Sequence, residues 1–518
     1  MSRFDRLACL VVVGLAALLR LPGIDARGRF DADQGHDMLT LVALTRDGVI
    51  PLLGPRTSVG EFHHGAFYYF LLAPAAGLSN GDPVAVTAFI ALLGIVAVAL
   101  TWWLARAIGG PLAGALAGLL MAVSPAAIEQ STFIWNPNPI ACFAVLALAA
   151  AWKARTGARP GRAWWAVALG SAGAVTQLHV LGVVFLLAIL ALALLELRRD
   201  RGVAVGILGG LGVILVMFLP LIAHELQTGF LETRRVLDYL QGGDESQFGG
   251  PLAAVGFTLL RVVGWPIVGL VTDVPAAAAI VLAVTVGLAA VGLLRARHAD
   301  ATGAQATGLH WLVGILAWST LALAFAAPSL QRVVPGLPND HYHAFLDPIV
   351  CILIAVPAAG LFARAVEAWR STRGPGAALL GAAIGTGLAL LVAVALLRKP
   401  PHADPDGGWP AMRAAGERIV RLTGTRPMLV YGLPAFKLPD AITFPIVHAG
   451  GRVLELTTGL DPVVVACDRL FETAIGLPCG GPAEDRLIGP GSSIDSLVLI
   501  ERFDTSPRTS VSIYGPPR

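Results

Sequence analysis

Long apolar runs are the feature that most constrains how this chain can fold. About thirteen of them are long enough to cross a bilayer, for which a helix needs roughly 20 apolar residues. Backbone groups in lipid need internal partners and the runs do not alternate apolar with polar residues, so we expect helices rather than barrel strands. The runs are 7–24, 64–80, 84–107, 111–128, 134–152, 163–177, 179–197, 203–224, 252–273, 276–295, 309–327, 344–366 and 376–398.

The composition agrees with an integral membrane protein. Only 14% of the 518 residues are charged and the mean hydropathy is +0.72, whereas soluble proteins carry roughly a quarter charged residues. The net charge of +3 argues against nucleic acid as a partner. The first run follows Arg3 and Arg6 and has no clear small-residue cleavage pattern, so we expect an uncleaved first helix.

Basic residues in the short loops predict the orientation of the helices. Such residues favour the cytoplasmic side, and they gather at 153–162, 198–201, 295–298 and 364–373. The exterior segments are then 25–62, 225–251, 328–343 and the tail after 398. Abundant Ala, Gly, Leu and Arg suggest a GC-rich bacterial genome, so we expect a bacterial plasma (inner) membrane protein with its exterior segments in the periplasm.

Two runs disturb this alternation. The run 64–80 is short and contains Pro74 and two glycines, and 252–273 contains Arg261 and Pro266. If 64–80 and the next two runs all cross, the basic segment 153–162 falls outside. We expect that 64–80 is re-entrant. Whether both runs cross or neither does, the tail stays outside.

The tail has the pattern of a small soluble α/β domain. Short strands are expected at 426–432, 463–468 and 496–503, and an amphipathic helix at 409–422. Cys467 and Cys479 form either a disulfide in an oxidising compartment or two free thiols. The predicted fold is therefore an α-helical polytopic membrane module (1–398, about 11–13 transmembrane helices) followed by a soluble domain (399–518).

The first exterior loop contains the acidic stretch "RFDADQGHD", Arg29 to Asp37. Asp33 and Asp37 are four residues apart and would share one face of a helix. The stretch 34–48 has helical apolar spacing and ends in glycine. Asp31 or Asp33 would cap that helix and complement its dipole. The alternatives are a catalytic acidic cluster and simple capping acids in a solvated loop.

The same loop contains His63 and His64, which precede an aromatic-rich segment. A helix N-terminus is a natural phosphate site. Tyr68 and Tyr69 are expected to anchor the segment at the membrane interface. Asp33, His63 and His64 together with His36 form an alternative divalent metal site, since these residue types suit zinc.

Three further exterior segments carry candidate binding residues. Glu129 and Asn136 lie at the ends of two helices, unless this segment is a plain connecting turn. His341 and Tyr342 open a later helix, where they either bind a phosphate or belong to an interfacial belt. Arg234 and Arg235 could grip a phosphate with their guanidinium forks, or lie on a solvated basic face.

Ionisable residues thus collect on exterior loops, while the apolar runs hold almost none. A transporter is expected to carry such residues near the bilayer midplane, where Arg261 is the main candidate. Sugar transfer from a polyprenyl phosphate needs one carboxylate base and donors for the departing phosphate. A glycoside hydrolase would need two matched carboxyl groups.

Four segments in residues 1–400 resemble GT-C membrane glycosyltransferases, in the branch of protein O-mannosyltransferases and lipid A aminoarabinose transferases. They are "FDADQGHD", "GPRTSVGEFHHGAFYYFLLAP", "SPAAIEQSTFIWNPNP" and "HYHAFLDP". The resemblance implies that Asp33 is the catalytic carboxylate of the first exterior loop. Gln34 replaces the family's neighbouring Glu, and Asp37 is the candidate substitute for it. His63 and His64 stand where the family often has Lys or Pro.

These observations predict an inverting glycosyltransferase at the outer face of the membrane. It would move a sugar from a polyprenyl-phosphate donor to a hydroxyl of a lipid, glycan or protein. Asp33 would be the base, supported by Asp31 and Asp37, with a divalent metal as the one cofactor considered. The alternatives are a flippase for a lipid-linked sugar and a glycan ligase with a polyprenyl-diphosphate carrier.

Overall fold

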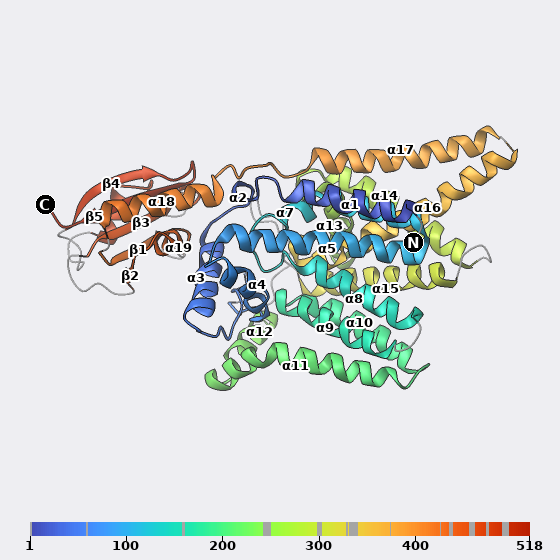
Figure 1. The fold of residues 1–518 in the computed structure, drawn as a ribbon, viewed down its shortest axis with the longest axis horizontal. Helices are drawn as coiled ribbons and strands as arrows, with labels where there is room; N and C mark the ends of the chain where they lie inside the picture. Colours follow the sequence, from blue (N-terminus) through green and yellow to red (C-terminus); the bar gives the residue numbers. More distant parts are fainter. Residues whose placement is uncertain are drawn as a thin grey trace.

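The structure is a computed structural model in which helices form an elongated bundle and a small sheet domain projects from one end (Figure 1). It describes residues 3–57, 61–157, 161–241, 250–297, 303–327, 330, 340–372, 374–424, 426–434, 439–454, 461–472, 476–488 and 497–517.

The bundle is built from apolar helices joined by short connections. Its elements are α1 (Arg3–Arg20), α2 (Ile24–Arg27), α3 (Ala32–Arg46), α4 (Phe67–Leu78), α5 (Pro83–Gly109), α6 (Pro111–Val123), α7 (Pro125–Glu129), α8 (Ile140–Thr156), α9 (Arg162–Leu178), α10 (Gly182–Leu197), α11 (Val203–Thr228), α12 (Leu231–Gln241), α13 (Pro251–Val268), η1 (Val271–Asp273), α14 (Pro275–Arg297), α15 (Gly303–Ala326), η3 (Asp340–Leu346), α16 (Asp347–Thr372) and α17 (Pro375–Leu397).

Seven of the described helices are long and apolar enough to cross a membrane, which makes this a multi-pass membrane protein. They are Pro83–Gly109, Val203–Thr228, Pro251–Val268, Pro275–Arg297, Gly303–Ala326, His341–Ser371 and Pro375–Leu397. We call the end of the bundle that carries α2, α3, α4, α12 and the sheet domain the loop end. The N-terminus lies at the opposite end (Figure 1).

The runs 64–80 and 252–273, which disturbed the predicted alternation, correspond to α4 and to α13 with η1. Helix α4 has 12 residues, too few to cross a bilayer. The end of α13 lies beside the end of α17, because Arg398 Nε donates to the Val268 carbonyl at 3.1 Å and the Arg398 guanidinium pairs with Asp273 at 3.1 Å. Helix α14 therefore starts at the loop end. Helix α4 is thus too short to cross, whereas α13 is one of the seven helices that are long and apolar enough to do so.

The run 111–128 forms two consecutive helices rather than one continuous helix. Helix α6 ends at Val123, and Ser124 caps the short helix α7, with Pro125 in its first turn. Proline has no N–H to donate to a carbonyl of the preceding turn, but it fits the first turn of a new helix without strain. The break leaves Glu129 and the residues up to Pro139 as a loop-end segment.

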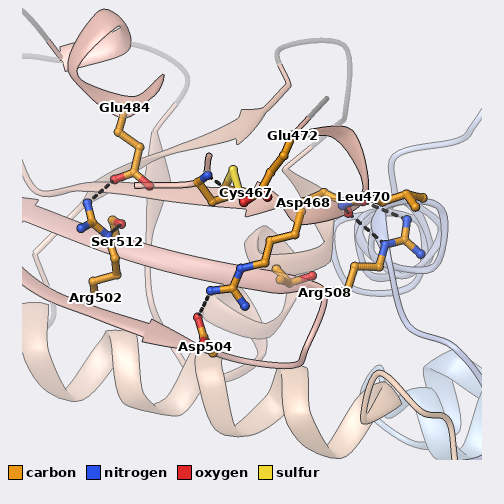
Figure 2. The surroundings of a disulfide bond; sticks show 12 residues. Cys467, Asp468, Leu470, Glu472, Glu484, Arg502, Asp504, Arg508 and Ser512 are labelled. Atoms are coloured by element: carbon orange, nitrogen blue, oxygen red, sulfur yellow. Dashed lines mark hydrogen bonds and ion pairs between the residues drawn. A yellow bond between two sulfur atoms is a disulfide. The ribbon is translucent and has the colours of Figure 1, made fainter. Parts of the chain in front are cut away.

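The C-terminal domain contains a five-stranded sheet with the order β2-β1-β3-β5-β4. Its elements are α18 (Gly408–Thr423), β1 (Met428–Leu433), α19 (Asp440–His448), β2 (Val453–Leu454), β3 (Val463–Asp468), η4 (Arg469–Phe471), α21 (Pro482–Ile488), β4 (Val498–Asp504) and β5 (Thr509–Gly515). Strand β1 is parallel to β2 and β3, and β5 is antiparallel to β3 and β4. Cys467 and Cys479 form a disulfide, not two free thiols (Figure 2).

An aromatic seam joins this domain to the bundle. Phe30, just before α3, packs against Trp409 of α18 at 4.9 Å and Phe444 of α19 at 5.9 Å between ring centroids. All three rings are buried. The backbone of Asp404 also donates to the carbonyl of Ala26 at 2.7 Å. The domain is thus held directly over the start of α3.

Candidate active site

The start of α3 is fixed by a capping box. The Asp31 side chain accepts a hydrogen bond from the Asp33 amide at 3.2 Å, and the Asp31 amide donates to Gln34 Oε1 at 3.0 Å. This pattern satisfies two amides that the helix leaves unpaired. Gln34 Nε2 also donates to the Ile134 carbonyl at 2.9 Å. Asp31 is therefore a capping residue, and the turn after it is rigid.

Asp33 lies exposed in the first turn of this capped helix. The helix dipole favours a carboxylate at that position. Asp37, four residues later, is buried, so the two acids do not share the environment that helical spacing suggested. The cause is α4, whose Tyr68 and Tyr69 hydroxyls each donate to Asp37 at 2.9 Å and cover the second turn.

Burial raises the pKa of Asp37 to about 7, although the bonds from both tyrosines oppose the rise. Asp37 is thus a buried packing acid and not an exposed partner of Asp33. The two tyrosines are buried as well, at 0% and 1% exposure. The expectation that they anchor the chain at the membrane interface is wrong, because they bind Asp37 inside the protein.

His36 contacts the C-terminal domain. Its Nδ1 lies 3.0 Å from Asp440 Oδ2 at the start of α19, and this hydrogen bond raises the pKa of His36. Next to it, a Cβ on Gly35 would lie 2.0 Å from the Asp440 carbonyl oxygen, so only glycine fits. Within the described part of the chain, no three His, Cys, Asp or Glu side chains are grouped to hold a metal ion.

His63 is bound to α12 through Glu232. Its amide and Nδ1 lie 2.7 and 3.1 Å from Glu232 Oε2, and Arg235 pairs with the other carboxylate oxygen at 2.7 Å. Arg234 is exposed and donates to the Thr228 carbonyl at 3.3 Å. The structure therefore brings His63 and Arg235 together on one buried carboxylate and leaves Arg234 on the surface.

His64 belongs to a different, buried cluster. Its Nδ1 accepts a hydrogen bond from the Val180 amide at 3.3 Å, and its ring lies 4.8 Å from that of His179. Burial lowers the pKa of His64 to about 3. A neutral imidazole that accepts at Nδ1 carries its proton on Nε2. His64 is therefore a neutral donor at Nε2.

His179 connects this cluster to η3. Its ring lies 4.6 Å from Tyr342 and 5.7 Å from His341, whose ring is 4.3 Å from Trp135. His179 Nδ1 accepts from the Leu181 amide at 3.3 Å, and burial lowers the pKa of His179, so it too is neutral and protonated at Nε2. Sequence reasoning missed His179. The available signal was a histidine at the first position of the apolar run 179–197.

The segment from Glu129, the last residue of α7, to the start of α8 connects the start of α3 with the histidine cluster. Asn136 donates to the Leu178 carbonyl at 2.6 Å and so fixes the turn that carries His179. Glu129 pairs with Arg29, just before α3, at 3.3 Å. With the bond from Gln34 to Ile134, one segment holds both the start of α3 and the histidine cluster. The helix start that carries the exposed Asp33 and the histidine cluster are therefore connected through one segment.

Comparisons with known proteins support the overall fold. Residues 53–224 match the dolichyl-phosphate-mannose-protein mannosyltransferase family. The structure is similar to ArnT from Cupriavidus metallidurans bound to undecaprenyl phosphate, with a TM-score of 0.57, 15% identity and 97% of each chain covered. The chain has the GT-C fold. No curated protein sequence matches it.

A second GT-C structure supports the same fold. The oligosaccharyltransferase AglB from Archaeoglobus fulgidus, in complex with an inhibitory peptide and a dolichol-phosphate, has a TM-score of 0.51 and 11% identity, over 91% of this chain and 70% of that one. The predicted GT-C membrane fold is thus confirmed. The family match includes His63, His64, Asn136 and His179, whereas Asp33 precedes it.

Proposed function

We propose that this chain is a membrane glycosyltransferase that moves a sugar from a polyprenyl-phosphate donor to a hydroxyl acceptor. The observation that carries the proposal is the position of Asp33. It lies exposed at a rigid helix start that Gln34 bonds to Ile134, and the adjacent Trp135 packs on the cluster of His341, His179 and His64. The matched mannosyltransferase family and the ArnT complex with undecaprenyl phosphate support this donor class.

In the proposed reaction, the acceptor oxygen attacks the anomeric carbon of the donor sugar from the face opposite the phosphate. The bond from that carbon to the phosphate oxygen breaks, and its electron pair leaves with polyprenyl phosphate. Asp33 takes the proton of the acceptor hydroxyl. The single displacement inverts the anomeric configuration. One carboxylate is sufficient, in agreement with the burial of Asp37.

The departing phosphate needs hydrogen-bond donors that are already in place. His64 and His179 each commit Nδ1 to a backbone amide, so their Nε2–H groups are fixed in direction. His341 and Tyr342 pack on the same rings. Neutral donors inside a poorly solvated site interact more strongly with an anion than they would in water. We assign this cluster, with His63 and Arg235 beside Glu232, to the donor phosphate.

The loop end is proposed to face the exterior of a bacterial plasma membrane. The disulfide in the C-terminal domain agrees with an oxidising compartment on that side. The basic residues at the ends of α8, α14 and α16 agree with a cytoplasmic opposite end. The sugar would thus be transferred at the outer leaflet to a lipid, glycan or protein acceptor.

The test is sugar transfer by the full-length chain in proteoliposomes loaded with polyprenyl-phosphate sugars. Asp33→Asn is expected to lower kcat by about 10²–10⁴-fold with little change in KM. Asp47→Asn, at the other end of α3, is the matched control and should stay near wild type. Full activity of Asp33→Asn would remove Asp33 from the mechanism. Passage of the donor across the bilayer without transfer would instead indicate a flippase, and transfer only from a diphosphate carrier a ligase.

A further inference from the structure

A cavity of about 260 Å³ lies between the start of α3 and the C-terminal domain. Its wall is formed by the residues before α3, by the linker to α18 and by the ends of β1, β3 and β5 nearest the bundle. Two of its lining residues, Asp468 and Arg508, are drawn in Figure 2, where dashed lines join their side chains. The charged residues on the wall are Arg29, Asp31, Asp404, Asp406, Asp468 and Arg508.

The wall carries more negative than positive charge, with four aspartates and two arginines. Arg508 binds Asp468 through two bonds of 2.9 and 2.8 Å and lies 4.0 Å from Asp406. Burial, together with the neighbouring carboxylates Asp406 and Asp31, raises the pKa of Asp404. The excess of carboxylates would repel an anionic ligand, whereas hydroxyl and ammonium groups can donate hydrogen bonds to them.

Apolar surface completes the wall. Phe30, Met412 and Leu433 line the cavity together with Ala441 and Ala466. A sugar ring presents hydroxyls at its edge and C–H groups on its faces, and this wall offers carboxylates for the one and apolar side chains for the other. The volume is below the roughly 300–1,000 Å³ of drug-sized sites. It suits a single sugar unit rather than a polypeptide segment.

We infer that this cavity is the acceptor subsite and that the acceptor is an uncharged or amino-substituted saccharide. The inference deepens the proposed function and rests on the assignment of Asp33 as the base. Asp31 forms part of the wall and caps the helix turn that carries Asp33. The cavity therefore adjoins the helix turn that carries the base, and Gln34 of the same turn is bonded to Ile134, next to Trp135 of the histidine cluster.

The subsite exists only while the C-terminal domain is docked, because 14 of its 18 lining residues belong to that domain and the other four lie at the start of α3. The domain would then complete the enzyme and select its acceptor, in addition to covering the membrane module. This role agrees with the three contacts that hold the domain on the bundle. They are the close approach of Gly35 to Asp440, the His36–Asp440 hydrogen bond and the aromatic seam.

Saccharide binding can be measured without catalysis. The probes are methyl glucoside, methyl glucosaminide and methyl glucuronide, and the readout is saturation-transfer NMR on the full chain carrying Asp33→Asn in nanodiscs. We expect signals from the first two glycosides and at least fivefold less from the glucuronide. Equal binding of all three, binding of the glucuronide alone, or no binding at all would overturn the inference.

Two variants locate the binding. Ala441→Leu fills the cavity and should lower both signals at least fivefold. Asp406→Lys reverses one wall charge and should shift the preference toward the glucuronide, which loss of folding cannot mimic. Glu417→Lys, the same charge change on the exposed face of α18, is the control and should leave the preference unchanged. If both cavity variants bind as their parent does, the subsite is elsewhere.

The two hypotheses fail separately. If the glycosides bind as expected but the chain with Asp33 intact turns over no polyprenyl-phosphate donor, the proposed function is wrong and the saccharide site remains. If the donor is turned over but transfer is unaffected by Ala441→Leu and Asp406→Lys, the subsite inference is wrong and the proposed function remains.

Discussion

Gln34 occupies a position where the resembling family has an acid, and its two hydrogen bonds show why an amide serves here. Oε1 accepts from the Asp31 amide while Nε2 donates to the Ile134 carbonyl. A carboxylate can make the first bond but not the second. The departure from the family pattern thus fixes the helix start against the segment of Trp135 and Asn136, and it removes no reacting group from the proposed mechanism.

Gln34→Glu should therefore destabilise the chain even though it restores the family residue. The new carboxylate oxygen would face the buried Ile134 carbonyl without a proton between them, which costs about 1–3 kcal/mol. Thermal melting in detergent should show a lower Tm than wild type. Gln227→Glu on an exposed position of α11 is the control. A Tm at or above that of wild type would show that the bond to Ile134 is dispensable.

Asp37 should make stability depend on pH near neutrality. Its pKa rises from 3.8 to about 7 on folding, so the folded chain holds the proton more tightly. The stabilisation is complete below about pH 4 and is lost as the pH rises through 7. The Tm of the wild type should thus fall more steeply between pH 5 and 8 than the Tm of Asp37→Asn. Parallel curves for the two proteins would contradict the assignment.

Among the elements, α3 joins the most parts of the site. Its first turn carries Asp33, Asp37 is buried against α4, and Gly35 contacts the start of α19. Because a Cβ on Gly35 would lie 2.0 Å from a backbone oxygen of α19, no side-chain movement can relieve the overlap. The contact between α3 and α19 is therefore the element-scale condition for docking.

Gly35→Ala is expected to loosen the docked domain. Overpacking of this kind costs about 1–3 kcal/mol, and a difference of 1.4 kcal/mol is a tenfold change in an equilibrium constant. Hydrogen exchange of the α19 amides should accelerate about tenfold, and sugar transfer should fall with it. The matched control is Gly14→Ala, where a Cβ meets open space. Unchanged exchange in α19 would show that the interface adapts to the methyl group.

Sequence reasoning succeeded where one local pattern decides an element. The apolar runs predicted the helices, and the three short tail segments 426–432, 463–468 and 496–503 predicted β1, β3 and β4. It missed β5, whose Ser510 and Ser512 are buried where strands usually bury apolar residues, and the two-residue β2. It predicted that the loop-end segments gather, but the partners of each side chain, such as Glu232 for His63 and Asp440 for His36, come from segments far apart in the chain.

At the scale of the whole molecule, the disulfide is expected to stabilise the C-terminal domain independently of the bundle. It joins residues separated by 12 in sequence, and closing a loop of about this size contributes roughly 3 kcal/mol. Cys467→Ser with Cys479→Ser should accelerate exchange of the β3 amides, while the bundle helices keep their wild-type rates. Cys9→Ser is the control. Unaltered exchange in β3 would show that the sheet is stable without the bond.

The aromatic seam of Phe30, Trp409 and Phe444 has a consequence for protein engineering. Its rings come from both sides of the boundary between bundle and domain. A chimaera that exchanges only the residues after 398 would keep Phe30 and Gly35 but lose the surfaces shaped to receive them. Exchange of specificity between related transferases should therefore succeed when α3 is exchanged together with α18 and α19. The chimaera junctions would then lie on either side of α3 and in the linker.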